Sequence, residues 1–123
     1  MTEMRSAVEW SNTPTNRALE QFVSALAHAD AKRLAGLVRG DIRWRPAGGR
    51  SIAGVKAFCA TMVRHGPAHT LTIEHLLSQG NAGAVAGVVE FGLRRRGFCF
   101  IVEFTDAKGS AIAEVVSYAV TVR

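Results

Sequence analysis

The sequence contains no apolar stretch long enough to span a bilayer, because glycines or charges interrupt the hydrophobic runs every few residues. The first ten residues include acidic side chains and lack the apolar core of a signal peptide. Only two cysteines occur, and they show no metal-ligand spacing, so we expect Cys59 and Cys99 to be reduced, largely buried thiols. These absences predict a cytoplasmic protein that does not associate with a membrane.

Clusters of charge are also scarce, although the formal net charge is +5. The tightest basic group is Arg94-Arg95-Arg96, which stands beside Gly97 between two strand-like segments and is interpreted as the solvated tip of a hairpin. A nucleic-acid patch is the alternative interpretation, but no interleaved aromatic residues and no helix or groove motif accompany the arginines, so we expect no nucleic-acid partner.

The length of 123 residues and the 48% hydrophobic content indicate one domain with its own core. We expect an N-terminal extension over residues 1–12, packed as a short helix through Met4, Val8 and Trp10, followed by the domain proper over residues 13–123.

Helical periodicity dominates the first half of the chain. Thr13-Pro14 predicts a helix start, and apolar side chains then recur three or four positions apart at Leu19, Phe22, Val23 and Leu26. A second helical segment is expected to end at Gly40, and a short strand to span residues 41–45. Ser51 is expected to cap a third helix, whose apolar side carries Val55, Phe58, Met62 and Val63.

Period-two alternation replaces helical periodicity in the second half. Strands are predicted over about 70–79, with Leu71, Ile73, His75 and Leu77 on one face, then over about 82–93 and, after a turn at residues 94–97, through Phe98, Phe100, Val102 and Phe104. A last strand is predicted over about 111–122. Helices followed by an antiparallel meander indicate an α+β fold, in which three main helices pack in a strongly curved antiparallel sheet that forms a cone.

This order of elements resembles the nuclear transport factor 2-like, or SnoaL-like, superfamily over nearly the whole chain, from about Asn16 to Val122. Its local signatures are Phe22–Leu26 followed by Asp30, the strand Asp41–Arg45 and the closing Glu114–Tyr118. The resemblance implies a deep, mostly apolar pocket at the mouth of the cone, and a homodimer formed through the outer face of the sheet. The superfamily hosts isomerases, cyclases, dehydratases, epoxide hydrolases and non-catalytic binders, so the fold does not decide the function.

Ketosteroid isomerase, a member of this superfamily, uses a carboxylate to move a proton, with a phenol and a protonated carboxylic acid to hold the oxyanion. Alignment with this enzyme places Pro46 at the position of the proton-moving carboxylate, Phe22 at that of the phenol and Val102 at that of the protonated acid. An apolar side chain neither takes a proton nor donates a hydrogen bond, so we expect no steroid isomerisation by this set.

The catalytic sets of other members of the superfamily are also incomplete. The chain has three aspartates, Asp30, Asp41 and Asp106, all at element boundaries, which disfavours the Asp–Arg–Asp set of limonene-type epoxide hydrolases. The paired tyrosines of scytalone-type dehydratases are missing, because Tyr118 is the only tyrosine. The four histidines share no metal-ligand spacing, and no phosphate loop or dinucleotide fingerprint occurs, so we expect neither a metal nor a cofactor.

Three polar side chains remain as catalytic candidates: His75, Glu114 and Tyr118. His75 would be the best general base if its face is the inner one, although a histidine on an apolar face is more often a hydrogen-bonded core residue. Glu114 could act as an acid or base inside the cone, or could reach solvent near the end of its strand. Tyr118 more often anchors such a cone than acts on a substrate.

Two functions stay open. The first is binding of a small hydrophobic molecule in a dry pocket, which we expect to be lined by Phe22, Trp44, Phe58, Met62, Val85, Val89, Phe91, Phe100 and Val102. The alternative is an isomerase, cyclase or dehydratase acting on a small carbonyl compound, with His75 or Glu114 moving the proton and Tyr118 or Trp44 donating to oxygen. The expected outer face, with Cys99 and Ile101, is apolar enough to favour a homodimer.

Overall fold

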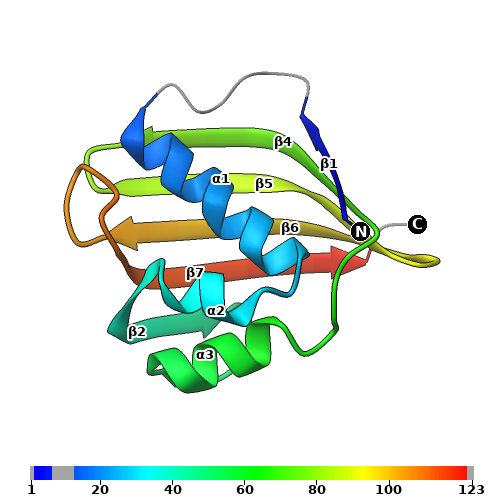
Figure 1. Cartoon of the computed structure of the whole chain (residues 1–123), viewed down its shortest axis with the longest axis horizontal. Helices are drawn as coiled ribbons and strands as arrows, with labels where there is room; N and C mark the ends of the chain where they lie inside the picture. Colours follow the sequence, from blue (N-terminus) through cyan, green and yellow to red (C-terminus); the bar gives the residue numbers. More distant parts are fainter. Residues whose placement is uncertain (1, 7–12, 122–123) are drawn as a thin grey trace.

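The computed structural model describes residues 2–6 and 13–121, and these form one curved sheet with helices against its concave side (Figure 1). Along the chain the elements are β1 (Glu3–Ser6), α1 (Pro14–Ala27), α2 (Ala31–Ala35), β2 (Val38–Pro46), β3 (Ile52–Ala53), α3 (Val55–Met62), β4 (Thr70–Gln79), β5 (Ala82–Phe91), β6 (Arg94–Phe104) and β7 (Ile112–Thr121). The strands lie in the order β1-β4-β5-β6-β7-β2-β3. This architecture confirms the predicted α+β cone.

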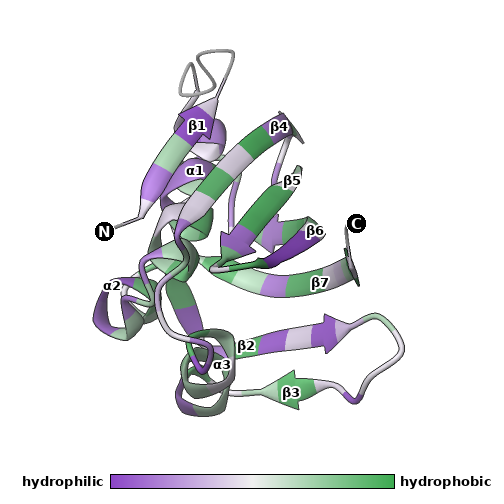
Figure 2. Ribbon diagram, turned by 90° about the vertical axis from the view of Figure 1, so that its right-hand side faces the viewer, coloured by the Kyte–Doolittle hydropathy of each residue, from purple (hydrophilic) through white to green (hydrophobic). Residues whose placement is uncertain are grey.

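The longest helix, α1, begins where the local sequence predicts it. Thr13 is the N-cap, and its side chain accepts a hydrogen bond from the Asn16 backbone N–H at 3.0 Å, while Pro14 occupies the first turn. The apolar side of α1 is fully buried against β4 and β5 at Leu19 and Phe22. The helix thereby fills the inside of the curved sheet (Figure 2).

The first half contains more strand than the sequence suggested. Helix α2 is capped by Gly36 rather than ending at Gly40, because β2 already begins at Val38. The Ile112 N–H donates to the Leu37 carbonyl at 3.0 Å, where pairing between β2 and β7 starts. The predicted strand at residues 41–45 is confirmed as the central part of β2.

The third helix also begins later than predicted. Ser51 does not cap it, because the next two residues form β3 and pair with β2. The N-cap is Gly54, whose φ of 95° lies in the left-handed region that favours glycine. The Gly54 N–H donates to the Ile42 carbonyl at 2.8 Å, which ties the start of α3 to β2.

The predicted antiparallel meander is confirmed as β4 to β7, but one turn is displaced. The β5–β6 hairpin turns at Gly92 and Leu93, where Gly92 has a φ of 61° and Leu93 is fully exposed. The three arginines therefore do not form the turn. They are the first three residues of β6, with Arg94 paired to Phe91, so strand alternation separates their side chains.

A β-bulge in β4 overturns the expectation that Leu71, Ile73, His75 and Leu77 share one face. Ile73 pairs with Gly87 and His75 pairs with Ala86, so Glu74 is left without a partner across the ladder. The extra residue reverses the alternation. Leu71, Ile73 and Leu76 are buried, whereas His75 and Leu77 are exposed.

The N-terminal segment is a strand and not the short helix predicted through Met4. Residues Glu3–Ser6 pair in parallel with β4 at the edge of the sheet. The buried Thr2 hydroxyl donates to the carbonyls of Ala27 at 3.1 Å and Ala68 at 2.6 Å, which ties the segment to the end of α1. Val8 and Trp10, the other side chains of the predicted helix, lie outside the described residues.

The core lies between the helices and the concave face of the sheet. Phe22 is its centre, with its ring 5.3 Å from Phe100 in an edge-on arrangement and 6.4 Å from Phe58 in a stacked one. Phe22 and Phe58, which are fully buried, each contribute about 1.5–3 kcal/mol. An apolar hollow opens beside this core.

Candidate functional site: an apolar hollow at the open end of the cone

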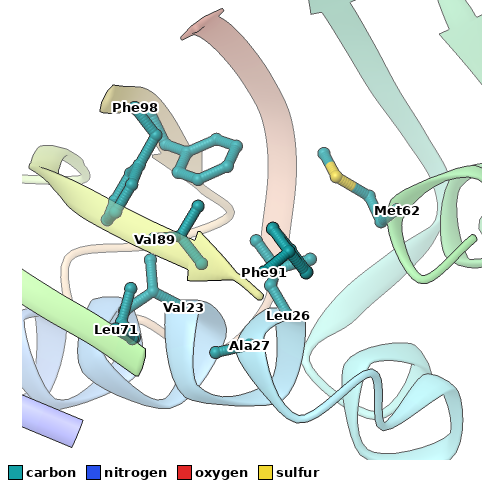
Figure 3. A pocket seen from close by; sticks show the side chains of 9 residues that line it. Val23, Leu26, Ala27, Met62, Leu71, Val89, Phe91 and Phe98 are labelled. Carbon is teal, nitrogen blue, oxygen red and sulfur yellow. The ribbon is translucent and has the colours of Figure 1, made fainter. Parts of the chain in front are cut away.

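The inner part of the hollow is a cavity of about 130 Å³ between α1 and the strands (Figure 3). Its lining comes from α1, α3, β4, β5 and β6 and is entirely apolar, consisting of Val23, Leu26, Ala27, Met62, Leu71, Val89, Phe91, Phe98 and Phe100. Alternate residues of β5 and β6 face inward, which brings the aromatic side chains together. A cavity of this character suits an aromatic ring or a short branched alkyl group.

The outer part is a wider cavity of about 540 Å³ that opens to solvent. It shares Met62, Val89, Phe91, Phe98 and Phe100 with the inner cavity, so the two form one hollow. At the outer part, Trp44 packs edge-on against Phe58 at 5.8 Å, and its Nε1 donates to the Ser117 Oγ at 2.8 Å. This hydrogen bond fixes the indole ring at the mouth.

The mouth of the hollow carries positive charge. Arg50, Arg64, His65 and Arg96 line the outer cavity together with its apolar residues, and no aspartate or glutamate is among its lining residues. A small recess of about 80 Å³ beside it is lined by His65, Phe91, Arg94 and Arg96. Basic side chains therefore border the apolar hollow, and no acidic residue lines it to neutralise them.

The pKa of His65 responds to the positive charges of the mouth. The Arg64 Nε donates to the His65 Nε2 at 3.3 Å, so the ring accepts there. Burial lowers the pKa of His65, and the charges of Arg64, Arg94 and Arg96 lower that pKa further. The imidazole is consequently neutral at neutral pH, and the positive charge of the mouth comes from arginines.

The predicted pocket residues divide into two groups. Five of them line the hollow: Trp44, Met62, Val89, Phe91 and Phe100. The other four, Phe22, Phe58, Val85 and Val102, are fully buried in the core beneath it. They face the same side of their elements as predicted, but they lie too deep to meet a ligand.

The three catalytic candidates have their side chains on the convex face of the sheet. The bulge turns His75 outward, and it is exposed. Ser117 points to the mouth, so its neighbour Tyr118 directs its side chain to the opposite face, although Tyr118 also borders the outer cavity. Glu114 lies directly opposite Glu103 on β6. The structure therefore does not bring these side chains together in the hollow.

The convex face combines exposed apolar side chains with charges. Leu77, Ile101 and Val120 are 68%, 41% and 65% exposed. Glu90 forms a 3.0 Å salt bridge with Arg95 on this face. A hydrogen bond with Glu114, followed by repulsion from the same carboxylate, raises the pKa of Glu103.

Sequence reasoning missed the basic residues of the mouth. Arg96 alternates with Phe98 and Phe100 along β6, and this period-two signal would have placed it on the inner face had the turn been assigned to residues 92–93. Arg64 and His65 lie in the loop after α3, where hydrophobic periodicity cannot predict the direction of a side chain. The same alternation along β7 would have placed Ser117 on the inner face, because it shares that face with the buried Val115.

Positions aligned with the ketosteroid isomerase set carry no polar side chain toward the hollow. Phe22 and Val102 are fully buried, and Pro46 lines the outer cavity. Among residues 2–6 and 13–121, no three histidine, cysteine, aspartate or glutamate side chains gather to hold a metal ion. In that same part of the chain, no helix is long and apolar enough to cross a membrane.

Comparison with known proteins identifies the family. The SnoaL-like domain family matches residues 19–118, and the chain belongs to it. The comparison with curated proteins found no match.

Solved structures share the nuclear transport factor 2-like fold. A protein of unknown function with this fold from Burkholderia xenovorans is 18% identical, with a TM-score of 0.76 over 86% of this chain and 82% of that one. An LEH-like epoxide hydrolase from M. tuberculosis is 19% identical, with a TM-score of 0.70 over 85% and 77%. A protein with a ketosteroid isomerase-like fold from Catenulispora acidiphila, in complex with trimethylamine, is 15% identical, with a TM-score of 0.68 over 87% and 86%. These likenesses concern the fold.

Proposed function

We propose that this SnoaL-like domain binds a small, largely apolar molecule in the hollow of its cone. The observation that carries the proposal is the inner cavity of about 130 Å³, whose nine lining residues are all apolar and which opens into the wider mouth. Natural sequences pack their interiors closely, so an apolar hollow of this kind is the default binding site of a small domain.

Binding is favoured over the alternative of an isomerase, cyclase or dehydratase. A general base must come within hydrogen-bond reach of the proton that it removes. His75 and Glu114 lie on the convex face, so neither meets a molecule held in the hollow. The epoxide hydrolase of the same fold shares only 19% identity, and its reaction therefore lends no support to an activity here.

Fluorescence of Trp44 tests the proposal, because its indole lies at the mouth. Trp10→Phe, which removes the chain's other tryptophan, serves as the background protein. We expect 2-naphthamide, a neutral bicyclic probe, to change the Trp44 emission saturably, with a dissociation constant in the micromolar range. Calorimetry on the same protein checks the stoichiometry of one probe per chain.

A matched pair of variants locates the site. Val89 lines both parts of the hollow, whereas its neighbour Val88 faces the convex side of the same strand. Val89→Phe should fill the hollow and weaken probe binding by about tenfold or more, and Val88→Phe should leave it unchanged. Absence of saturable binding, or equal binding by both variants, would show that the hollow is not a ligand site.

We further propose that two copies associate through the convex face. Support comes from the exposed Leu77, Ile101 and Val120, and from a shallow groove of about 450 Å³ that Leu77 and Ile101 line. Sedimentation at micromolar concentration should give a species of twice the 13.2 kDa chain mass. Ile101→Lys should convert it to monomer, while Lys56→Glu, a charge change at an exposed position of α3 away from that face, should not. A single 13.2 kDa species of the unmodified protein would refute this arrangement.

A reducing, cytoplasmic location is also proposed. Cys59 and Cys99 are both free thiols, which supports a compartment where disulfides do not persist.

A further inference from the structure

Strand alternation separates the three arginines at the start of β6 into two environments. Arg95 faces the convex side and forms its salt bridge with Glu90 at 3.0 Å. Arg94 and Arg96 face the other side, where they line the recess beside the mouth with His65. Among the described residues, no carboxylate forms a salt bridge with Arg64, Arg94 or Arg96.

Of the three unpaired arginines, Arg64 and Arg94 are exposed, whereas Arg96 differs from an ordinary surface charge in its surroundings. Arg96 is half-buried, and it lines the outer cavity beside Phe98 and Phe100. A guanidinium remains charged at every physiological pH and presents its donors in a fork that fits a carboxylate. Apolar neighbours reduce solvent screening, so an anion that reaches the Arg96 guanidinium is held more strongly there than on an open surface.

The mouth and the inner cavity therefore present two different chemistries to one molecule. The inner cavity offers only hydrocarbon contacts, and the mouth offers cationic donors from Arg64 and Arg96. His65 accepts from Arg64 at Nε2 as a neutral ring, which leaves its Nδ1–H as a further donor. No acidic residue lines the outer cavity or the recess, so none competes with an incoming anion for the arginines.

We propose that the ligand of this domain is a small carboxylic acid with an aryl or alkyl body, bound with its body in the apolar hollow and its carboxylate on Arg64, Arg94 and Arg96. This inference rests on the proposed binding function and specifies the ligand class for the same site. Arg96 is the central donor, because it lines both the outer cavity and the recess.

A pair of probes with the same shape tests the inference. 2-Naphthoate and 2-naphthamide differ mainly in charge, so the ratio of their dissociation constants isolates the contribution of the carboxylate. At low ionic strength we expect naphthoate to bind at least about tenfold more tightly than naphthamide, which is the difference that a charge-assisted hydrogen bond contributes. The ratio should fall as salt is raised, because the Debye length shortens from about 30 Å at 0.01 M to about 3 Å at 1 M.

Two neighbouring arginines supply the variant and its control. Arg96→Met keeps an apolar stem and removes the charge, and we expect it to abolish the preference for naphthoate while leaving the affinity for naphthamide within about threefold. Arg95→Met removes a charge from the opposite face of the same strand and should keep the preference. If circular dichroism shows that Arg96→Met does not fold, the double variant Arg64→Gln/Arg94→Gln replaces it, with the same expected loss.

The outcomes separate this inference from the function on which it rests. Equal binding of naphthamide and naphthoate by the unmodified protein would overturn the carboxylate ligand and leave the apolar binding site standing. Binding of neither probe would overturn both. A preference for naphthoate that survives Arg96→Met and the double variant would show that these arginines do not hold the carboxylate, and would overturn the inference.

Discussion

Replacing Gly87 by alanine tests whether the bulge in β4 is as tightly constrained as the structure indicates. A Cβ on Gly87 would lie 1.9 Å from the carbonyl oxygen of Thr72 and 3.2 Å from the Cα of Ile73. The first distance falls far short of the 3.4 Å at which ordinary contact begins. Both neighbours are backbone atoms, so no side-chain rotation relieves the clash, and β4 must move away from β5.

The expected cost follows from what that movement disrupts. Two or three ladder hydrogen bonds beside the bulge would be lost or stretched, at about 1 kcal/mol each. Leu71 and Ile73, which are 2% and 4% exposed, would also shift out of the core. We expect Gly87→Ala to lower the free energy of unfolding by about 3 kcal/mol or more, a large part of the roughly 5–15 kcal/mol typical of a domain.

Urea unfolding followed by far-ultraviolet circular dichroism measures this change. Gly40→Ala is the matched control, because a Cβ there meets nothing within 4 Å and its φ is not in the left-handed region. The control should alter the free energy of unfolding by no more than about 0.5 kcal/mol. A loss below about 1 kcal/mol for Gly87→Ala would refute the view that the close approach of Thr72 defines the bulge.

Three further predictions concern the mouth, the convex face and the core. Trp44→Phe should destabilise the protein by about 1 kcal/mol through loss of its hydrogen bond to Ser117, and a double-mutant cycle with Ser117→Ala should show coupling between the two. Glu103→Gln removes a like charge opposite Glu114 and should raise the free energy of unfolding at about pH 7 by about 0.2–1 kcal/mol. Because the pKa of Glu103 is raised in the folded protein, the penalty in the unmodified protein appears only as pH rises through that pKa, so both proteins should unfold alike near about pH 3. Burial raises the pKa of Cys59, so peptide mapping should find its thiol unmodified by a small disulfide reagent at about pH 8 until denaturant is added.

For the candidate site, the sequence did not predict how deeply each side chain is buried or which face of the sheet it occupies. Periodicity correctly placed Phe22 and Phe58 on the inward sides of their helices, but it cannot distinguish a residue at the bottom of a core from one at a cavity wall. Trp44 and Phe100 do line the hollow. The face on which His75 lies could not be predicted, because it depends on the bulge in β4. That bulge is set by the pairing of β4 with β5 and not by the local sequence.

The start of α1, the β4–β5 turn, the alternation along β5 to β7 and the order of elements were readable in the sequence alone, because each depends on residues close together in the chain. Thr13-Pro14 begins α1, and Gly80, with a φ of 61°, turns between β4 and β5. The α+β cone follows from that order. Only the tertiary structure decided the bulge opposite Gly87, the addition of β1 to the sheet edge, and the presence of Arg64 and Arg96 in the lining of one cavity. Each of these joins segments far apart in the chain, where packing between strands determines the outcome and local sequence preference does not.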